Sequence, residues 1–408
     1  MARLERIVER LELKEFQLRS LLDVTKAINS NVLEDDLVSL YHSIVKDQLG
    51  ITKLMLHVNS DGWRTVLSYG TDGEMSDADI EQAANWFKDI QVIGGESPAG
   101  IGAFDVAVPI HHREKPLAFL LIGDIDEEEQ RISPTIKHLN FIQTLTNLIV
   151  VAMENKRMAR QELQQERDRR ELELAAEMQA MLIPRDLPKE KHLQAAGWYQ
   201  PHRQVGGDYY DLFHISPEKV VICVADVSGK GIAASLLMSN FQAHLRAALT
   251  HSSETLPVLV KALNDRVHAS ARGERFITLF IGLLDLPSGE MQFINAGHNS
   301  PLLLQNDKII ALHEGSIALG MMPTLPFLKE GSVSLEPKAT LICFTDGLVE
   351  QEDREERSFD TAPLETALRN RAHEGPQAVL DQLRTAFEDH RAGSPYLDDI
   401  AVLVCSYR

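Results

Sequence analysis

Four acidic positions in the C-terminal half of the sequence carry side chains that could hold a divalent cation. Asp226 follows the apolar run VVICVA, Asp346 follows ATLICFT, Asp208 comes after a double glycine, and the pair Asp398-Asp399 opens the last apolar run, IAVLVC. One Asp at the end of a strand is more often a turn or helix-cap residue. Several carboxylates held at the ends of rigid strands, with no His or Cys among them, are typical of a Mg²⁺ or Mn²⁺ site.

A dense series of short apolar runs would position these acids. Helices are expected after Gly231 and over 256–269, 361–370 and 376–389, whereas the strands expected from Leu187 to Arg408 are VVICVA, RFITLFIGLLD, MQFINA, SPLLLQ, KIIALH, ATLICFT and IAVLVC. Strands dominate the middle of this region, and the helices flank them instead of alternating with them. The pattern predicts a layered α+β domain rather than a doubly wound parallel sheet.

Six motifs occur in a fixed order in this region: VGGDYYDLF, ADVSGKG, NAGHNSP, ALG, FTDGLVE and DDIAVLV. In order and approximate spacing they resemble PPM-type metal-dependent protein serine/threonine phosphatases, specifically the SpoIIE or RsbU-like branch, which controls bacterial sigma factors by partner switching. The resemblance covers about residues 175–408. It implies an α-β-β-α layered sandwich over 185–408 and the removal of phosphate from Ser or Thr.

The resemblance also implies a set of site residues by position. The metal ligands and catalytic acids would be Asp208, Asp226, Asp346 and Asp398, with the backbone carbonyl of Val227 as a further ligand. Two Mn²⁺ or Mg²⁺ ions sharing Asp226 could bridge a water and lower its pKa, so that no protein nucleophile is needed. No Ser-His-Asp or Cys-His arrangement stands out in the sequence to supply one.

A phosphate-binding residue and a general acid are less well defined. Arg203 lies five residues before Asp208, the offset at which related phosphatases place an arginine on the substrate phosphate, although an ordinary surface arginine fits this position equally well. Lys230 stands where many relatives have His. The general acid is therefore open between Lys230, His298 and a metal-bound water, and we favour for His298 a structural role in holding its loop.

The N-terminal region has a different pattern of elements. Over 33–153 the runs ITKLMLHV and WRTVLSY predict a hairpin, and FDVAVPI and LAFLLIG predict two further strands, with helices before and after them. This layout resembles GAF domains, which are small sensor modules with an antiparallel sheet and flanking helices that often hold a ligand. An unrelated α+β sensor or dimerisation module is the alternative.

The first 32 residues predict a helix with a narrow apolar seam. Its heptad frame carries Leu4, Ile7, Leu11, Leu18, Leu21 and Ile28. Such a seam favours pairing with another helix, and therefore a coiled coil and a homodimer. An ordinary amphipathic helix packed on its own domain would show the same pattern.

Residues 154–184 predict a linker helix. The stretch ENKRMARQELQQERDRRELE is polar on nearly every face, and an apolar stripe of Leu174, Met178, Met181 and Leu182 follows before Pro184 ends the helix. We interpret the stripe as docked on the downstream domain, and AAEMQAMLIP resembles the regulatory switch helix that precedes the catalytic domain in this phosphatase branch. A rigid spacer is the alternative.

Composition excludes several classes of partner. The formal net charge of −19 repels nucleic acid and anionic membranes, so we expect neither as a partner. The N-terminus has no secretory signal, and no apolar segment is long enough to span a bilayer. The three cysteines, Cys223, Cys343 and Cys405, lie in apolar runs and are expected to be buried in a reducing compartment. These features predict a cytoplasmic protein.

Together these observations predict a sensor-regulated, metal-dependent serine/threonine protein phosphatase. The resemblance implies that its substrate is a phosphorylated STAS-domain anti-anti-sigma factor, while the sensor would bind an unknown small ligand or protein. A catalytically silent regulator that binds its phosphoprotein without turnover is one alternative, and a small-molecule phosphohydrolase is another.

Overall fold

The computed structural model describes residues 2–71, 75–93, 101–102, 104–112, 115–123, 134–184, 186–251 and 255–408. The chain forms two compact units, Met1–Glu166 and Arg167–Arg408, which are described separately below. No helix in the described part combines the length and the apolar character that a bilayer-spanning segment needs.

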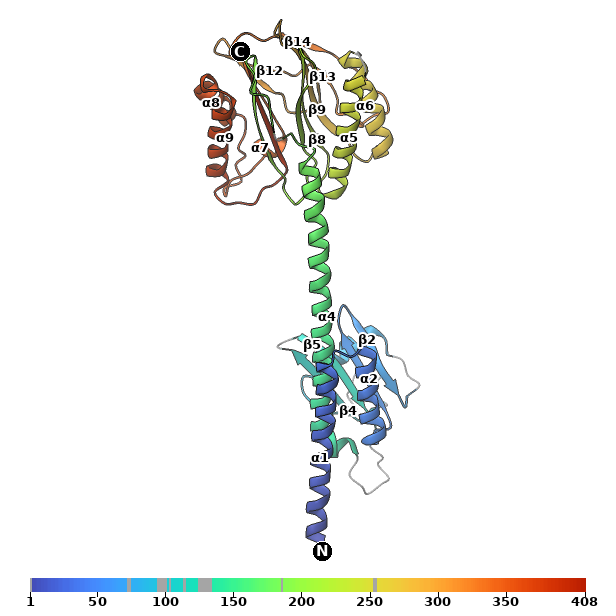
Figure 1. Ribbon diagram of the computed structural model, residues 1–408. Helices are drawn as coiled ribbons and strands as arrows, with labels where there is room; N and C mark the ends of the chain where they lie inside the picture. The colour runs from blue at the N-terminus through green and yellow to red at the C-terminus, as the bar shows by residue number, and fades with distance from the viewer. Residues whose placement is uncertain are drawn as a thin grey trace. The chain divides into compact units, whose positions relative to one another are not determined.

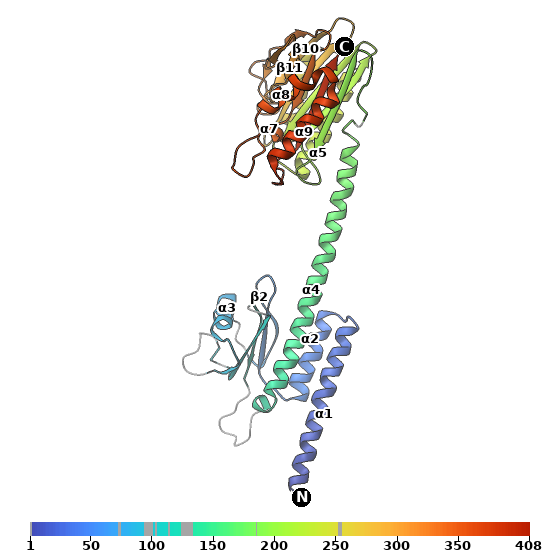
Figure 2. The ribbon, with the colours of Figure 1, turned by 90° about the vertical axis from the view of Figure 1, so that its left-hand side faces the viewer.

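The N-terminal unit is built on one antiparallel sheet with helices on both faces. Its strand order is β2-β1-β5-β4-β3, with β1 Leu54–Asn59, β2 Trp63–Tyr69, β3 Gln91–Val92, β4 Val106–His112 and β5 Lys115–Ile122. Helices α1 (Ala2–Asn29), α2 (Glu34–His42, continued by a π-helical turn, Ser43–Gln48) and the first part of α4 cover one face, and α3 (Asp77–Trp86) covers the other (Figure 2). The α+β organisation is confirmed, whereas kinship with GAF domains stays a prediction.

The apolar seam of α1 divides into two parts. Leu21 and Ile28 pack against the core of their own unit, next to the buried Val24. Leu4, Ile7, Leu11 and Leu18 are exposed in this chain. Only the N-terminal part of the predicted seam is therefore available to a second helix, because the unit's own core already uses the C-terminal part.

Helix α4 runs without a break from Pro134 to Ala180, which confirms a long helix through the polar segment. Its first part contributes Ile142, Leu145, Ile149, Val150 and Met153 to the core of the N-terminal unit. Good helix formers and pairs such as Arg169 with Glu173, one turn apart, support the polar stretch that follows.

The C-terminal unit consists of two sheets packed face to face between helices. One sheet has the order β13-β10-β9-β8-β7, with β14 also paired to β10, and the other has the order β12-β11-β15-β16-β6. The strands of the first sheet are β7 Tyr209–Ser216, β8 Lys219–Val227, β9 Ile277–Asp285, β10 Glu290–Ala296, β13 Gly315–Ser316 and β14 Gly331–Ser334. Those of the second are β6 Leu193–Gln200, β11 Leu302–Gln305, β12 Lys308–Ala311, β15 Thr340–Phe344 and β16 Ile400–Tyr407.

Two pairs of helices cover the outer faces of this sandwich. Helices α5 (Ile232–His251) and α6 (Leu256–Ala271) lie on one side, and α8 (Ala362–Arg371) and α9 (Pro376–Arg391) lie on the other (Figure 1). The short α7 (Asp346–Val349) follows β15. The predicted α-β-β-α layers are thus confirmed.

The large core of the first sheet, which extends to α5–α6 on one face and to the second sheet on the other, contains the three cysteines, which are all buried and free, as predicted. A second core lies between the other sheet and α8–α9, where Trp198 and Phe359 both meet Phe387 edge-on. Alternation explains the division, because successive residues of β15 and β16 point to opposite faces. Cys343 and Cys405 face the inner core, whereas Ile342 and Val404 face the helices.

Four strands of this unit were absent from the sequence-based prediction, namely the short β13 and β14 and the longer β6 and β7. β6 (LQAAGWYQ) is rich in small residues, and β7 (YYDLFHIS) carries the acidic Asp211 in its middle. Small residues weaken the strand signal of β6, and the charged Asp211 interrupts an otherwise strand-favouring run in β7. Tertiary partners stabilise them instead: β6 pairs along its full length with β16, and Asp211 is buried against Arg246, whose Nε and Nη2 donate to it over 2.7 and 2.8 Å.

Candidate active site

All four predicted acids lie at the ends of strands at one end of the sandwich. Asp208 directly precedes β7, Asp226 lies next to the last residue of β8, Asp346 opens α7 just after β15, and Asp398 lies two residues before β16. The two sheets therefore bring together residues that are far apart in the sequence.

The electrostatics of these acids confirm that they are neighbours. Burial raises the pKa of Asp208 well above its usual range, and the charge of Asp226 adds to this effect. Burial and then the charge of Asp346 raise the pKa of Asp226 to about 7. Burial raises the pKa of Asp346 as well, with Asp398 contributing. The negative charge of the cluster is not fully compensated, and a bound divalent cation would neutralise it.

The donor chemistry of the cluster fits a hard cation, because every group is a carboxylate. Within the described residues, however, no three His, Cys, Asp or Glu side chains form a ready metal-binding group. Asp398 is instead held by Lys230, whose Nζ lies 2.7 Å from its Oδ2. The four-ligand arrangement therefore stays a prediction.

Two glycines allow the backbone segments of the site to approach one another. A Cβ atom on Gly207 would lie 3.0 Å from the carbonyl oxygen of Val227, so this predicted ligand lies beside the backbone that leads into Asp208. A Cβ atom on Gly347 would lie 2.0 Å from the carbonyl oxygen of Asp399, a separation that no side chain tolerates. These positions explain the glycines of the VGGD and TDG motifs.

Thr345 positions Asp208 and was not identified from the sequence. Its Oγ1 donates a 2.6 Å hydrogen bond to Oδ2 of Asp208 and accepts one of 2.9 Å from the backbone of Ala401. Both Thr345 and Asp208 are buried. The only available signal was that Thr345 directly precedes Asp346.

Asp399 holds the loop that precedes Asp208. Its two carboxylate oxygens accept hydrogen bonds from the backbone nitrogens of His202, over 2.7 Å, and Gly207, over 2.6 Å. Within the pair at the start of β16, Asp399 is therefore the buried, loop-binding member, whereas Asp398 is partly exposed.

Arg203 lies on the same loop and is exposed. No hydrogen bond or ion pair joins its guanidinium to another residue in the described ranges. An unpaired guanidinium on the loop that leads into Asp208 is suited to a phosphoryl group, since its planar fork can donate to two oxygens.

His298 is buried and holds its loop. Its backbone nitrogen donates to Oδ1 of Asn295 over 2.8 Å, and its Nδ1 lies 2.8 Å from Oγ1 of Thr278, which pairs with Asp226 across the sheet. Burial lowers the pKa of His298 to about 4, so the imidazole is neutral near pH 7. These contacts support the structural role over that of a general acid.

The end of α4 differs from the prediction that its apolar stripe docks on the downstream domain. Met178 and Met181 are 70% and 75% exposed, Leu174 is exposed as well, and Leu182 is half-buried. The contact is polar instead: Gln179, only 7% exposed, donates to the carbonyl oxygen of Gly206 over 2.6 Å and accepts from its nitrogen over 3.0 Å. The predicted docking of Leu174, Met178 and Met181 is therefore wrong, because these side chains are exposed and the buried amide of Gln179 makes the contact instead.

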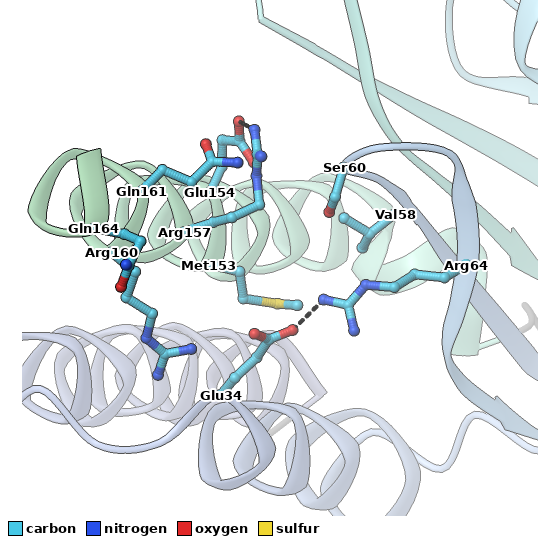
Figure 3. Close-up of a pocket in the computed structure, with 10 residues that line it drawn as sticks. All are labelled: Glu34, Val58, Ser60, Arg64, Met153, Glu154, Arg157, Arg160, Gln161 and Gln164. Atoms are coloured by element: carbon cyan, nitrogen blue, oxygen red, sulfur yellow. Dashed lines mark hydrogen bonds and ion pairs between the residues drawn. The ribbon is translucent and has the colours of Figure 1, made fainter. Parts of the chain in front are cut away.

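The N-terminal unit contains a pocket of about 470 Å³ between α4, the start of α2 and the β1–β2 hairpin (Figure 3). Buried Met153 and Val58 form its apolar part. Arg64 pairs with Glu34 across it, and Arg157 makes two bonds, of 2.8 and 2.9 Å, to Glu154. Its size and mixed lining suit a small polar ligand.

Comparison with known proteins agrees with this fold. The SiaA-PP2C domain of Pseudomonas aeruginosa, 19% identical, superposes with a TM-score of 0.51 over 60% of this chain and 98% of that domain. The C-terminal unit therefore has the PP2C-type, or PPM-type, phosphatase fold.

The family comparison is more specific. Residues 216–408 match the family described as Stage II sporulation protein E (SpoIIE), which confirms the resemblance of the C-terminal unit to the SpoIIE and RsbU-like branch. The matched range begins after Arg203 and Asp208.

Two curated relatives extend the comparison. Protein IcfG of Synechocystis sp. is 27% identical over 417 residues, which covers 92% of this chain and 65% of that protein. Phosphoserine phosphatase RsbU of Bacillus subtilis is 28% identical over 182 residues, which covers 44% of this chain and 53% of that protein. The chain thus spans less than two thirds of the length of each of these relatives.

Proposed function

We propose that this protein is a metal-dependent phosphatase that removes phosphate from serine or threonine of a protein. The carrying observation is that Asp208, Asp226, Asp346 and Asp398 lie together at one end of a PP2C-type sandwich, where burial and neighbouring carboxylates raise the pKa of the first three. The name of the relative RsbU, a phosphoserine phosphatase, supports the same reaction class.

In this proposal the four acids and the carbonyl of Val227 hold two Mn²⁺ or Mg²⁺ ions. The ions supply Lewis-acid activation of water and of the phosphoryl group. Arg203 orients the phosphoryl oxygens, and Thr345 and Asp399 keep Asp208 and its loop in place. Lys230 orients Asp398. Either Lys230 or a metal-bound water serves as the general acid.

The proposed substrate is a STAS-domain protein phosphorylated on serine, as in the partner-switching pathways of this phosphatase branch. The test measures phosphate release from such a protein by the full chain with Mn²⁺, with Mg²⁺ and with EDTA. We expect release with either ion and none with EDTA. The carboxylates of the site are negatively charged, so without a cation they cannot neutralise the charge of a phosphoryl group. Binding without release in all three conditions would favour the silent regulator.

We further propose that the protein is a homodimer and that the segment from Met178 to Leu182 regulates the catalytic unit. The exposed Leu4, Leu11 and Leu18 offer an apolar stripe to a second copy, and exposed Met178 and Met181 offer another. Sedimentation velocity at micromolar concentration is expected to show a dimer. A monomer at that concentration would refute the dimer.

A further inference from the structure

Four large apolar side chains are exposed around the candidate metal centre. Ile232, Leu236, Phe276 and Leu397 are 55%, 65%, 37% and 40% exposed, respectively. They come from the first turns of α5, from the residue before β9 and from the loop before β16. We call these four residues the apolar rim.

Lys230 and its neighbours connect two rim residues to the centre. The Nζ of Lys230 lies 2.7 Å from Oδ2 of Asp398 and donates to the carbonyl oxygen of Leu397 over 2.6 Å. Ile232 follows two residues later as the first residue of α5, and Leu236 lies one helical turn further along the same face.

Ser228 connects Phe276 to the centre from the other side. Ser228 lies two residues after Asp226, and its backbone nitrogen donates to the carbonyl oxygen of Phe276 over 2.9 Å. The backbone nitrogen of Phe276 donates in return to Oγ of Ser228, also over 2.9 Å. Each rim residue is therefore tied to a segment that carries one of the candidate metal ligands.

The loop that carries the unpaired Arg203 contacts the segment of one rim residue as well. Its neighbour His202 contacts the carbonyl oxygen of Tyr396 through Nδ1 over 2.6 Å, and Tyr396 precedes Leu397. A phosphoryl group bound by Arg203 would thus lie near the segment that carries Leu397. Exposed apolar groups gathered at a polar centre are typical of surfaces that bind another protein.

We propose that the apolar rim docks a folded phosphoprotein whose phosphoserine or phosphothreonine is flanked by apolar surface side chains. This inference rests on the proposed phosphatase function and specifies which surface of the substrate the site recognises. The partner's dianionic phosphoryl group complements Arg203, and its apolar surroundings complement the rim. A second copy of this chain on the same surface would close the centre to any substrate.

The test compares kcat/KM of the full chain for two substrates, p-nitrophenyl phosphate and a STAS-domain protein phosphorylated on serine. The double variant Ile232→Gln/Leu236→Gln keeps neutral side chains at exposed helical positions, so the fold should be retained. We expect kcat/KM for the phosphoprotein to fall about tenfold more than that for p-nitrophenyl phosphate, as for the loss of central apolar contacts in an interface.

Val258→Gln provides the matched control. Val258 is an exposed apolar residue near the start of α6, which pairs with α5. Helix α5 has 20 residues and is therefore roughly 30 Å long. The rim residues of α5 lie at its start, whereas Val258 lies just after its end, so Val258 is remote from the rim. Val258→Gln should leave the ratio of the two kcat/KM values as in the wild type.

Equal losses on both substrates, or no loss on either, would overturn the docking role of the rim. A wild-type protein that hydrolyses neither substrate would instead refute the phosphatase function. The rim would then be tested by calorimetric titration of the phosphoprotein into the full chain. Weaker binding by the double variant would support the rim, and equal affinity would overturn it.

Discussion

Replacing Asp226 by asparagine is expected to lower kcat/KM for p-nitrophenyl phosphate and for a phosphoprotein by about a thousandfold or more, as for the loss of a central electrostatic group. Asp226 interacts with Asp208, Asp346 and Asp398, so it is the acid most able to be shared between two cations. Asparagine keeps the shape of the side chain and removes the charge. Steady-state kinetics with saturating Mn²⁺ measures the effect.

The fold of this variant should be retained, because the charge of Asp226 opposes folding in the absence of metal. Burial and neighbouring acids raise the pKa of Asp226 to about 7 in the folded protein. The stabilising contribution of the protonated side chain is therefore fully present below the ordinary pKa of 3.8 and is lost as the pH rises through 7. In EDTA at pH 8, Asp226→Asn should therefore melt at the same temperature as the wild type or higher.

Asp381→Asn is the matched control, since Asp381 is exposed on α9 and its carboxylate accepts a hydrogen bond from Gln377 of the same helix. It should keep wild-type activity. If Asp226→Asn stays as active as this control, the metal-ligand assignment is wrong.

Replacing Gln179 by alanine is expected to reduce activity tenfold to a hundredfold and to raise the Mn²⁺ concentration needed for half-maximal activity. The variant removes both hydrogen bonds to Gly206, which is buried two residues before Asp208. Leaving a buried backbone group without a hydrogen bond costs about 1–3 kcal/mol. Because ~1.4 kcal/mol corresponds to a factor of ten in rate, this cost spans the expected loss of activity. Titrating activity against Mn²⁺ measures both changes.

Glu177→Ala tests whether the effect belongs to the buried amide or to the helix end in general. Glu177 is exposed on the same helix, two residues earlier. It should behave as the wild type. A Mn²⁺ titration of Gln179→Ala that superposes on that of the wild type would refute a role for Gln179 in positioning the loop of Asp208.

The acids of the site could be predicted from the sequence because each lies at a local signal. Asp226 and Asp346 follow long apolar runs, and Asp208 and Asp346 adjoin glycines. Strand ends and glycine turns are encoded within a few residues, so the positions can be recognised without knowledge of the tertiary structure.

The residues that hold those acids could not be predicted in the same way. Thr345 and Asp208 are 137 residues apart in the sequence, and the backbone of Gly207 meets Asp399 across 192 residues. Gln179 reaches Gly206 only because α4 ends beside that loop. A hydroxyl, an amide or a second aspartate has no distinctive local pattern, so only the packing of strands and helices reveals what each one binds.

The same limit applies to the apolar faces of the helices. Periodicity predicted α1 and α4 correctly as helices, but it does not distinguish an apolar residue that faces its own core from one that faces solvent. In α1, Leu21 and Ile28 pack inward while Leu4 and Leu11 are exposed, and in α4 the stripe around Met178 is exposed.

The sequence by itself therefore determined the layered α+β fold, the order of the phosphatase motifs, the long polar helix and the buried cysteines, because these depend on hydrophobic period and on local turn residues. Only the tertiary structure decided which acids become neighbours, which side chains hold their loops and which apolar residues stay exposed around the centre. Those features depend on contacts between segments that are distant in the sequence, and they form only when the two sheets and their helices pack together.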